Sequence, residues 1–590
     1  MKKIFALLMI AVMTLSLAAC GKTKDETTTN PETTNAKFKA GTYEGTAKGF
    51  GGDIVATVKL SDDKIEDITV VGDSETENIG SVAVETLPAL MVQKQTVDVD
   101  GVSGATVSSD AVKAAVTNAL ESAGVDVSAL VPAEAEEAET AKTEETLDYD
   151  VVVIGGGGAG MTSAIELKNA GLNVVILEKM PMLGGNSVKA TGGMNAAETK
   201  VQEKLGIKDS VEQFVQDTMT GGHNLNNIDL VRTLAENSAD AIDWLESIGA
   251  PLSEVTFSGG ATNKRCHRPE GGAAVGSYLV DVFSKDLDKL DIDVMLNTKA
   301  TELMMDNGKA VGVKAESDST DYTINAKAVI LATGGFGANE ELYTKYRPEL
   351  AGYVTTNAPG ATGDGIVMAE AVGANLVDME QIQTHPTVEQ TTSIMITEGV
   401  RGEGAILVNQ SGKRFTDELL TRDVVSDAIV KQEGNYAYIV FDQALRDRLS
   451  AIDSYVENGI TVQADTIEEL AGLINVDSAT LAETLSTWNK AVEAKKDAEF
   501  DRTTGMDYDL TTGPYYAIKI APGVHHTMGG LEIDTQAEVM NTEGNVISGL
   551  FAAGEVTGGI HGGNRIGGNA VADIVVFGRI AAASAIDYLK

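Results

Sequence analysis

The chain has 590 residues, 43% of them apolar, and a formal net charge of -42 at pH 7. This length exceeds what one hydrophobic core supports and predicts about three or four folded units. The negative charge argues against nucleic acid as a partner, because a phosphate backbone would be repelled. A solvated acidic surface explains the charge better than an acidic docking function does.

The first twenty residues have the pattern of a targeting segment. Lys2 and Lys3 precede an apolar run, residues 4–17, which is short for a membrane span and ends near Cys20. The LAAC sequence resembles a bacterial lipoprotein processing site, which implies that Cys20 becomes the acylated N-terminus. We therefore expect a lipoprotein signal peptide at 1–20 and a lipid anchor on the extracytoplasmic face of the cell membrane. A simple secretory signal with an incidental cysteine is the alternative. In the lipoprotein interpretation, acylation of Cys20 leaves Cys266 without a disulfide partner.

Residues 21–36 are polar and rich in threonine, which predicts a flexible tether. Residues 37–125 then predict a small α+β domain. Alternating segments at 42–49, 53–60 and 64–72 are typical of strands, with glycine and Asp-Asp turns between them. A glycine-containing, hydroxyl-rich loop follows and leads into a helix expected from about Ala111 to Ser122. Taken alone, this loop is also explained by a helix N-cap at Ser109 or Asp110.

The loop Asp100-Gly101-Val102-Ser103-Gly104-Ala105-Thr106 resembles that of a small FMN-binding domain family. In that family FMN is held covalently, through a phosphoester to a hydroxyl side chain. The resemblance implies covalent FMN at Thr106, attached by a separate flavin transferase. Residues 126–147 are acidic and rich in Ala, Glu and Thr, which predicts a linker or at most a marginal helix. Such a linker would let the FMN domain move toward a second flavin.

Residues 150–178 predict a dinucleotide-binding unit of strand, glycine turn, helix and strand. In this unit Gly155 permits a tight turn, Gly157 lets the backbone approach a pyrophosphate, and Gly160 lets the helix pack on its strand. Glu178 ends the second strand, where its carboxylate can accept hydrogen bonds from a ribose hydroxyl. The same carboxylate would repel a 2′-phosphate, which argues against NADP.

Further glycine-rich turns follow the fingerprint. Residues 182–187 and 190–195 combine glycine with hydroxyl and amide donors, which suits passage along a second phosphate and a ribityl chain. A strand at 328–331 runs into another turn at Thr333. No second GxGxxG follows a strand, so we expect no NAD(P)H site in this chain. The histidine and cysteine spacings contain no HxH, HExxH or CxxC, so we predict no metal site.

From Asp148 to the C-terminus the sequence resembles the soluble fumarate reductase flavoprotein family, relatives of the succinate dehydrogenase flavoprotein and of urocanate and other 2-enoate reductases. The resemblance is carried by the fingerprint and by QTHPT, ITEGVRGEG, LLTRD, VHHTMGG and HGGNRIGG. It implies an α/β fold, a Rossmann-like FAD-binding domain split by an inserted α+β clamp domain. The expected parts are FAD-binding residues 148–355 and 513–590 and a clamp at 356–512. No CxxCH haem motif is present, and the FMN domain would take the place of a cytochrome.

The fingerprint and the resemblance together imply non-covalent FAD. His526 is expected beside this flavin rather than against substrate. The residues expected to hold FAD are Gly155, Gly157, Gly158, Ala159, Gly160, Glu178, Lys179, Asn186, Ser187, Gly192, Gly193, Thr333, Gly334, His526, Glu555, Ala570 and Val571.

Reduction of an activated C=C bond needs a hydride donor, an acid, and cations that grip the carboxylates. The resemblance assigns His525 and Arg565 to one carboxylate of fumarate, and the planar fork of arginine suits that contact. It assigns the other carboxylate to a second set, namely His385, Thr397, Glu398 and the backbone of Gly568.

The proton donor in this family matches Arg422, with Glu398 and Arg401 as a relay. An arginine acid is unexpected from its reference pKa, and it requires transient donation followed by immediate replacement of the proton. The alternative is that Arg401 and Arg422 form structural salt bridges, since Arg422 precedes Asp423. Among the other histidines, His267 is expected to be structural, and His223 and His561 have no assigned role.

The leading hypothesis is a reductase that passes electrons from a membrane-associated donor to FMN, then FAD, then fumarate, giving succinate in anaerobic respiration. The first alternative is another unsaturated acid, such as urocanate or an acrylate-type or cinnamate-type acid. A second is the reverse reaction, oxidation of an amino acid or steroid, against which the FMN domain argues. A third is a lipoprotein flavin electron carrier with no substrate of its own.

Overall fold

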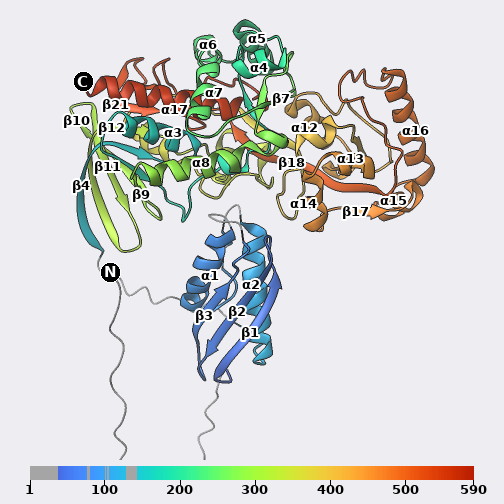
Figure 1. Ribbon diagram of the computed structural model, residues 1–590, viewed down its shortest axis with the longest axis horizontal. Helices are drawn as coiled ribbons and strands as arrows, with labels where there is room; N and C mark the ends of the chain where they lie inside the picture. Colours follow the sequence, from blue (N-terminus) through green and yellow to red (C-terminus); the bar gives the residue numbers. More distant parts are fainter. Residues whose placement is uncertain (1–37, 76–79, 100, 103–104, 128–129, 131–141) are drawn as a thin grey trace, which may run out of the picture.

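The computed structural model describes residues 38–75, 80–99, 101–102, 105–127, 130 and 142–590. The expected signal peptide with Cys20, the tether, and most of the linker lie outside the described residues. The described residues form three domains, of which the last is inserted into the second (Figure 1). We call them the N-terminal domain (38–127), the core domain (143–382 and 524–590) and the clamp domain (383–523).

The N-terminal domain is a three-stranded antiparallel sheet with two helices packed on it. In β2, alternate residues such as Ile54, Ala56 and Val58 are buried, as a half-covered strand requires. The three predicted strands are confirmed. The described elements are β1 Gly41–Lys48, β2 Asp53–Leu60, β3 Ile65–Val71, α1 Gly80–Lys94 and α2 Thr106–Ser122.

Two helices of this domain differ from the prediction. Helix α1 was not expected and has Pro88 in its interior, a residue that usually interrupts helices. Helix α2 begins at Thr106, five residues before the expected start at Ala111. Ser109 therefore lies inside the helix, where its hydroxyl accepts a hydrogen bond from the Val102 N–H at 2.9 Å. The proposed N-cap at Ser109 or Asp110 is wrong, and Ser109 instead ties the preceding loop to the helix.

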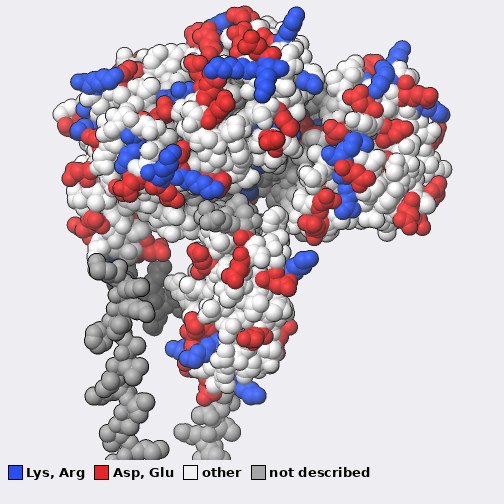
Figure 2. All heavy atoms as spheres, in the orientation of Figure 1, with Lys and Arg blue, Asp and Glu red and all other residues white. Residues whose placement is uncertain are grey.

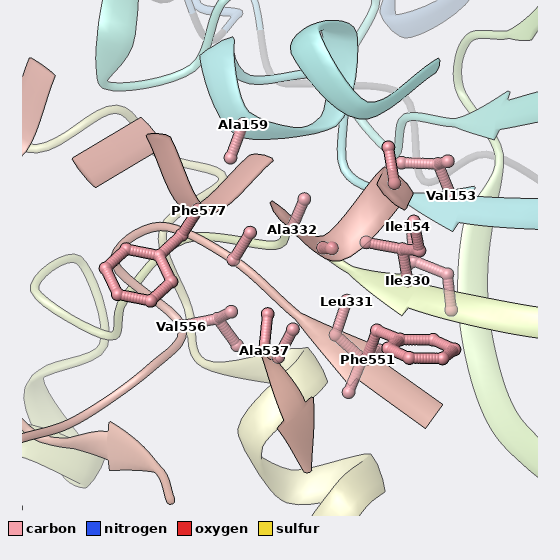
Figure 3. Packing of buried hydrophobic residues seen from close by; sticks show 14 of the residues in the cluster. Val153, Ile154, Ala159, Ile330, Leu331, Ala332, Ala537, Phe551, Val556 and Phe577 are labelled. Carbon is pink, nitrogen blue, oxygen red and sulfur yellow. The ribbon is translucent and has the colours of Figure 1, made fainter. Parts of the chain in front are cut away.

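The core domain is built around a sheet with the strand order β10-β11-β21-β12-β4-β5-β9. Strand β4 lies between β12 and β5, parallel to both, and is covered on both faces, which explains the uninterrupted apolar run at 151–154. Figure 3 shows Val153 and Ile154 packed with Ile330, Leu331 and Phe551 of the neighbouring strands. The predicted strand–turn–helix–strand unit is therefore confirmed.

The core domain also contains a small sheet, β6-β8-β7. The strands of the whole core domain are β4 Thr143–Ile154, β5 Val174–Leu177, β6 Met194–Asn195, β7 Glu254–Thr256, β8 Cys266–Arg268, β9 Asp293–Met295, β10 Lys299–Asp306, β11 Lys309–Glu316, β12 Thr320–Leu331, β13 Leu376–Val377, β19 Gly530–Leu531, β20 Glu538–Met540 and β21 Val546–Ala552. Its helices are α3 Gly158–Asn169, α4 Lys200–Leu205, α5 Val211–Gly221, α6 Ile228–Glu236, α7 Ser238–Ser247, α8 Val275–Lys289, α9 Glu340–Tyr346, α10 Asp364–Ala371 and α17 Asn569–Tyr588.

The clamp domain has its own core and a sheet of order β14-β18-β16-β15, with β17 also paired to β18. Its strands are β14 Ile382–Val388, β15 Ile406–Val408, β16 Ala437–Asp442, β17 Val462–Ala464 and β18 Tyr515–Thr527. Its helices are α11 Glu398–Gly402, α12 Arg422–Val430, α13 Gln443–Arg448, α14 Ala451–Glu457, α15 Ile467–Leu473 and α16 Ser478–Ala494.

The domain boundaries differ from those expected. Residues 143–147, assigned to the linker, belong to β4 and pair with β12. Helix α10, assigned to the clamp, buries Ile366 in the core of the core domain. Ile518 and Ile520, assigned to the FAD-binding part, are buried in the clamp core. Packing of side chains decides these boundaries, and motif spacing alone does not report it.

The surface shows no single charged patch on the face in Figure 2, where acidic side chains are spread among fewer basic ones over all three domains. One helix in the described part of the chain, α17, is long and apolar enough to span a membrane. It is mostly buried, and it packs against α3, where the Ser163 hydroxyl donates to the Gly578 carbonyl at 2.8 Å. By composition and burial it is a core helix.

Candidate active site between the core and clamp domains

The glycine turn after β4 forms one end of a cavity in the core domain. Gly155 has φ +107°, and a Cβ there would lie 2.3 Å from the Ala332 carbonyl oxygen, so only glycine fits. A Cβ at Gly160 would meet the Gly155 carbonyl, which shows how closely α3 packs on its strand. Expected residues that line the cavity are Gly155, Gly157, Gly158, Ala159, Glu178, Lys179, Asn186, Ser187, Thr333, Gly334 and Glu555.

The polar groups of this cavity are arranged for a ligand. The Glu178 carboxylate accepts hydrogen bonds from the N–H groups of Gly156 and Met180, both at 2.8 Å, and keeps lone pairs for another donor. Burial raises the pKa of Glu178. Thr333 lines the cavity, and its buried hydroxyl has no hydrogen-bond partner among the described residues. These residues fit a dinucleotide with a ribose at Glu178.

Six of the residues expected to hold FAD do not line the cavity, namely Gly160, Gly192, Gly193, His526, Ala570 and Val571. Gly193 packs on β8, where a Cβ would lie 2.3 Å from the His267 carbonyl oxygen. One residue that the sequence did not reveal is Asp364 at the start of α10, which lines the cavity and pairs with Lys179 at 2.7 Å. A signal that could have identified Asp364 is its position directly after Gly363, as the first residue of a helix.

The predicted substrate residues come from separate elements that converge at the junction of the core and clamp domains. Two antiparallel strands, β14 and β18, bring the rings of His385 and His525 to a centroid distance of 5.3 Å. Thr397 precedes α11, and Arg422 is the first residue of α12. Arg565 lies just before α17 in the core domain.

One buried amide, Gln383, joins the arginines of the two domains. Its carbonyl oxygen accepts from Arg422 at 3.0 Å and from Arg565 at 3.3 Å. Its amide nitrogen donates to the Arg565 backbone carbonyl at 2.9 Å. Sequence reasoning missed Gln383, although it lies two residues before His385 in QTHPT, the spacing that places residues on one face of a strand.

Arg422 also pairs with Glu398, with 3.1 Å between Nη2 and Oε2. Asp423, considered above as its partner, instead contacts His223 at 2.9 Å, so the simple Arg422–Asp423 salt bridge is wrong. Burial by itself raises the pKa of Glu398, but the guanidinium groups of Arg422 and Arg401 outweigh it, and the net pKa lies below the ordinary value. Glu398 is therefore ionised at neutral pH.

Arg401 is fully buried one turn beyond Glu398. Its Nη1 donates to the Glu418 carbonyl at 2.5 Å, whereas Nε and Nη2 have no partner among the residues described. Burial lowers its pKa, and nearby Arg422 adds to this effect. The structure thus brings Glu398 together with both arginines of the expected relay.

Two imidazoles at this junction are held neutral. Burial is the main cause of the lowered pKa of His385 and of His525, and the positive charge of Arg422 lowers both further. The Nδ1 of His525 contacts the Thr356 hydroxyl at 2.7 Å. Neutral imidazoles can donate one hydrogen bond to a carboxylate without adding a further buried charge.

Arg565 is buried, and burial together with Arg422 lowers its pKa to about 9. Its Nε and the Nε2 of His385 are buried without hydrogen-bond partners within the described ranges. Gly568 adopts φ +87° at the start of α17, and its neighbour Gly567 would place a Cβ 3.7 Å from both Arg422 and Glu398. The HGGNRIGG segment therefore reaches the clamp residues directly.

Thr397 is positioned by a residue that the sequence did not reveal. Its backbone N–H donates to the Tyr455 hydroxyl at 2.9 Å, and its side-chain oxygen lies 3.4 Å from the Thr191 hydroxyl of the core domain. Tyr455 is buried, and burial raises its pKa to about 12. No sequence signal distinguished it from other clamp tyrosines.

The remaining histidines divide between the flavin side and the protein core. His526 contacts Glu555, a cavity-lining residue, at 3.5 Å but does not itself line the cavity, so its place beside the flavin stays a prediction. His561 contacts Asp573 at 3.2 Å in the interior. His267 is buried between Thr199 and the Arg265 carbonyl, each at 2.8 Å, which agrees with a structural role. No group of three or more potential metal ligands occurs among the described residues.

Two family models match this chain. The family model described as FAD binding domain matches residues 150–571, and the model described as FMN-binding domain matches residues 49–121. The FAD cavity and the two family matches thus define a flavoprotein with an FAD-binding and an FMN-binding domain.

Several proteins and structures similar to this chain are named as reductases or oxidoreductases. The NADH:fumarate oxidoreductase of Klebsiella pneumoniae is 45% identical over 93% of this chain and 58% of its own length. The urocanate reductase of Eggerthella lenta is 37% identical over 97% of this chain and 96% of its own. A flavocytochrome c3 fumarate reductase solved in an open conformation has a TM-score of 0.66 and 45% identity, over 75% of this chain and 79% of that one. This chain belongs to the same FAD-binding oxidoreductase family. It spans less than two thirds of the Klebsiella protein.

Proposed function

We propose that this protein is an FAD-dependent reductase that converts fumarate to succinate, with electrons supplied through FMN. Two relatives named above as fumarate reductases, at 45% identity each, support the substrate. The site explains why a dicarboxylate would bind.

The observation that carries the proposal is an excess of buried positive charge. Arg401, Arg422 and Arg565 converge at the domain junction, and among the described residues the one salt bridge to any of them joins Arg422 to Glu398. Buried cations are costly unless they are paired and hydrogen-bonded. A dicarboxylate would supply the missing negative charge and accept hydrogen bonds from atoms that lack partners.

Each residue then has a defined task. Arg565 and His525 hold one carboxylate, and the other is held by His385 and Thr397 with the Gly568 backbone. Glu398, which is ionised and can only accept hydrogen bonds, orients Arg422 instead of contacting the substrate. When bound, reduced FAD supplies the hydride to one carbon of the double bond. Arg422 delivers a proton to the other carbon, so that fumarate, hydride and proton together give succinate.

Proton resupply explains how an arginine can act as the acid. Arg422 already contacts the ionised Glu398 at 3.1 Å, and Arg401 lies one helical turn from that carboxylate. A proton lost from Arg422 would be replaced through Glu398 and Arg401. This avoids a lasting neutral guanidine, which the high pKa of arginine disfavours.

Electron supply and location complete the proposal. FMN would be joined covalently to Thr106 by a flavin transferase, and electrons would come from a membrane-associated donor. Acylation of Cys20 would hold the protein on the extracytoplasmic face of the membrane. The LAAC sequence and the FMN-binding family match support these assignments.

A second candidate substrate is urocanate, because the Eggerthella urocanate reductase matches this chain over nearly the whole of both lengths. The deciding experiment is anaerobic oxidation of a reduced viologen by the flavin-loaded protein, offered fumarate, urocanate, crotonate, acrylate and cinnamate in turn. Turnover with fumarate alone supports the dicarboxylate assignment. Turnover with another acid and none with fumarate overturns it.

The electron route has its own test. We expect Thr106→Ala to abolish turnover from the physiological membrane donor, while reduced viologen still drives fumarate reduction through FAD. Undiminished turnover from the physiological donor in Thr106→Ala would contradict the route. A protein that turns over none of the acids would instead be an electron carrier.

A further inference from the structure

A second cavity lies where the N-terminal domain meets the other two domains, and its volume is about 540 Å³. In Figure 1 the start of α2 faces the larger body of the molecule. The N-terminal domain contributes Gly101, Val102, Ser109, Asp110 and Lys113, and the core domain contributes Val188, Lys189, Ser277, Thr355, Asn357 and Pro359. Thr392, Ser393 and Ile394 of the clamp domain close it.

A single polypeptide segment separates this cavity from the FAD cavity. Ala358 and Gly360 line the FAD cavity, whereas Asn357 and Pro359 line the cavity between the domains. The same division occurs at a second place, where Ser187 lines the first cavity and Val188 the second. Adjacent residues thus face opposite cavities, and the wall is one backbone thick.

The lining suits a polar, anionic ligand, because two lysines face it against one carboxylate, Asp110. The cavity has the size of typical cofactor sites, which occupy roughly 300–1,000 Å³. Two cationic side chains, Lys113 and Lys189, come from opposite domains. Lys189 is also fixed by donating to the carbonyl oxygens of Thr356 at 3.2 Å and Asn357 at 3.3 Å. Burial lowers its pKa, which a nearby anion would offset.

We propose that this cavity seats the ring of FMN carried by the N-terminal domain, so that core and clamp residues complete the FMN site. The inference rests on the FMN attachment proposed above. Transfer across the wall would move two electrons from reduced FMN, which becomes oxidised, to FAD, which becomes reduced, with the protons released by FMN and those taken up by FAD exchanged with solvent. Electron tunnelling falls steeply with distance, and a wall of one backbone keeps the two flavins close.

Ser277→Trp tests the proposal from the core-domain side. Ser277 is an exposed residue of α8, so the bulky ring fills the cavity without entering a hydrophobic core. Ser411→Trp is the matched control, because Ser411 is also exposed and does not line the cavity. Fully reduced full-length protein is mixed rapidly with fumarate, and flavin absorbance follows reoxidation. The fast phase reports reoxidation of FAD by fumarate. The slower phase reports reoxidation of FMN, whose electrons pass through FAD.

We expect Ser277→Trp to slow the second phase several-fold and leave the first phase and viologen-driven turnover unchanged. Quenching of oxidised FMN fluorescence by iodide, a readout independent of turnover, should also increase because FMN is displaced into solvent. Ser411→Trp should change neither. Unchanged FMN reoxidation and unchanged quenching in Ser277→Trp, with FMN still attached, would overturn the cavity assignment and leave the proposed function intact.

Lys113→Glu provides a second variant that does not depend on a bulky side chain, with Lys64→Glu as its control of equal charge change on the same domain. Lys113 lines the cavity, whereas Lys64 is exposed in the turn between β2 and β3. We expect slower FMN reoxidation in Lys113→Glu alone. Equal behaviour of the two variants would contradict the inference. Absence of covalent FMN from the wild-type protein would overturn both the attachment and the cavity.

Discussion

Two groups of buried arginines lie within the same part of the molecule, and they differ in how they are paired. In the clamp core, Glu418 accepts from Arg414 at 2.8 and 2.9 Å and from Arg502 at 2.9 Å. Asp497 adds a contact to Arg414 at 2.9 Å, and Trp488 stacks beneath both guanidinium groups. This group has as many carboxylates as arginines.

At the domain junction the arginines outnumber the carboxylates that pair with them. Of Arg401, Arg422 and Arg565, Arg422 alone forms a salt bridge in the described part of the chain, to Glu398, whereas Glu418, Glu555 and Asp573 act on the other two only at longer range. Several nitrogens of Arg401 and Arg565 have no hydrogen-bond partner there. The pKa values report the same difference. Although burial lowers it, the pKa of Arg414 is raised by Glu418 and Asp497, whereas that of Arg565 is lowered to about 9. Arginines that are fully paired with carboxylates stabilise the fold, whereas the excess positive charge at the junction favours binding of an anion.

The largest effect should follow from removing the acid at the junction. We expect Arg422→Ala to lower kcat for fumarate by about a hundredfold to ten-thousandfold, the range for loss of a positioned general acid. Both flavins should stay bound, because Arg422 lines neither flavin cavity. Viologen-linked turnover and flavin content measure this. Arg232→Ala, at an exposed surface position, is the control. Full activity in Arg422→Ala would remove it from the mechanism.

Breaking the balanced group should instead cost stability. Glu418→Gln leaves Arg414 and Arg502 with less compensating charge, and breaking a buried ion pair in this way costs about 3–5 kcal/mol. We expect a lower denaturation midpoint by circular dichroism, with activity retained in the folded fraction at low temperature. Glu403→Gln, which affects only the exposed contact with Arg448, should have little effect. An unchanged midpoint in Glu418→Gln would show that the pairing adds nothing.

The unbalanced group should respond to pH. The pKa of Arg565 is lowered to about 9, so in the free enzyme its guanidinium loses its proton as the pH rises through that value. Only the charged form grips a carboxylate, so KM for fumarate should be flat below about pH 8 and rise roughly tenfold per pH unit above the pKa. Steady-state kinetics across this range measure the effect. A KM that stays constant to about pH 10 would contradict the shift.

The smallest effect should come from removing the hydrogen bond between Tyr455 and the Thr397 backbone. Tyr455→Phe removes the hydroxyl that accepts from the Thr397 N–H, and a lost buried hydrogen bond costs about 1–2 kcal/mol. We expect KM to rise roughly fivefold to thirtyfold with kcat little changed, because substrate binding is affected and the acid is not. Tyr508→Phe, at an exposed clamp position, is the control. A fall in kcat alone would show that Tyr455 acts elsewhere.

Much of the core domain could be predicted from the sequence. A buried parallel strand requires an uninterrupted apolar run, and a phosphate turn requires glycine at positions such as Gly155, so local chemistry determines both. The three strands of the N-terminal domain were predicted for the same reason, since alternation of apolar residues follows from a half-covered sheet.

Only the tertiary structure decided how distant segments share one site. Gln383 and Tyr455 act through contacts with residues far along the chain, and those contacts are formed only in the folded protein. The start of α2 at Thr106, the true clamp boundaries and the cavity lined by Lys113 and Lys189 likewise depend on packing between domains. Residue types determine which chemistry is available. Long-range packing determines which of those residues meet, and whether a buried arginine finds a carboxylate or remains free for a ligand.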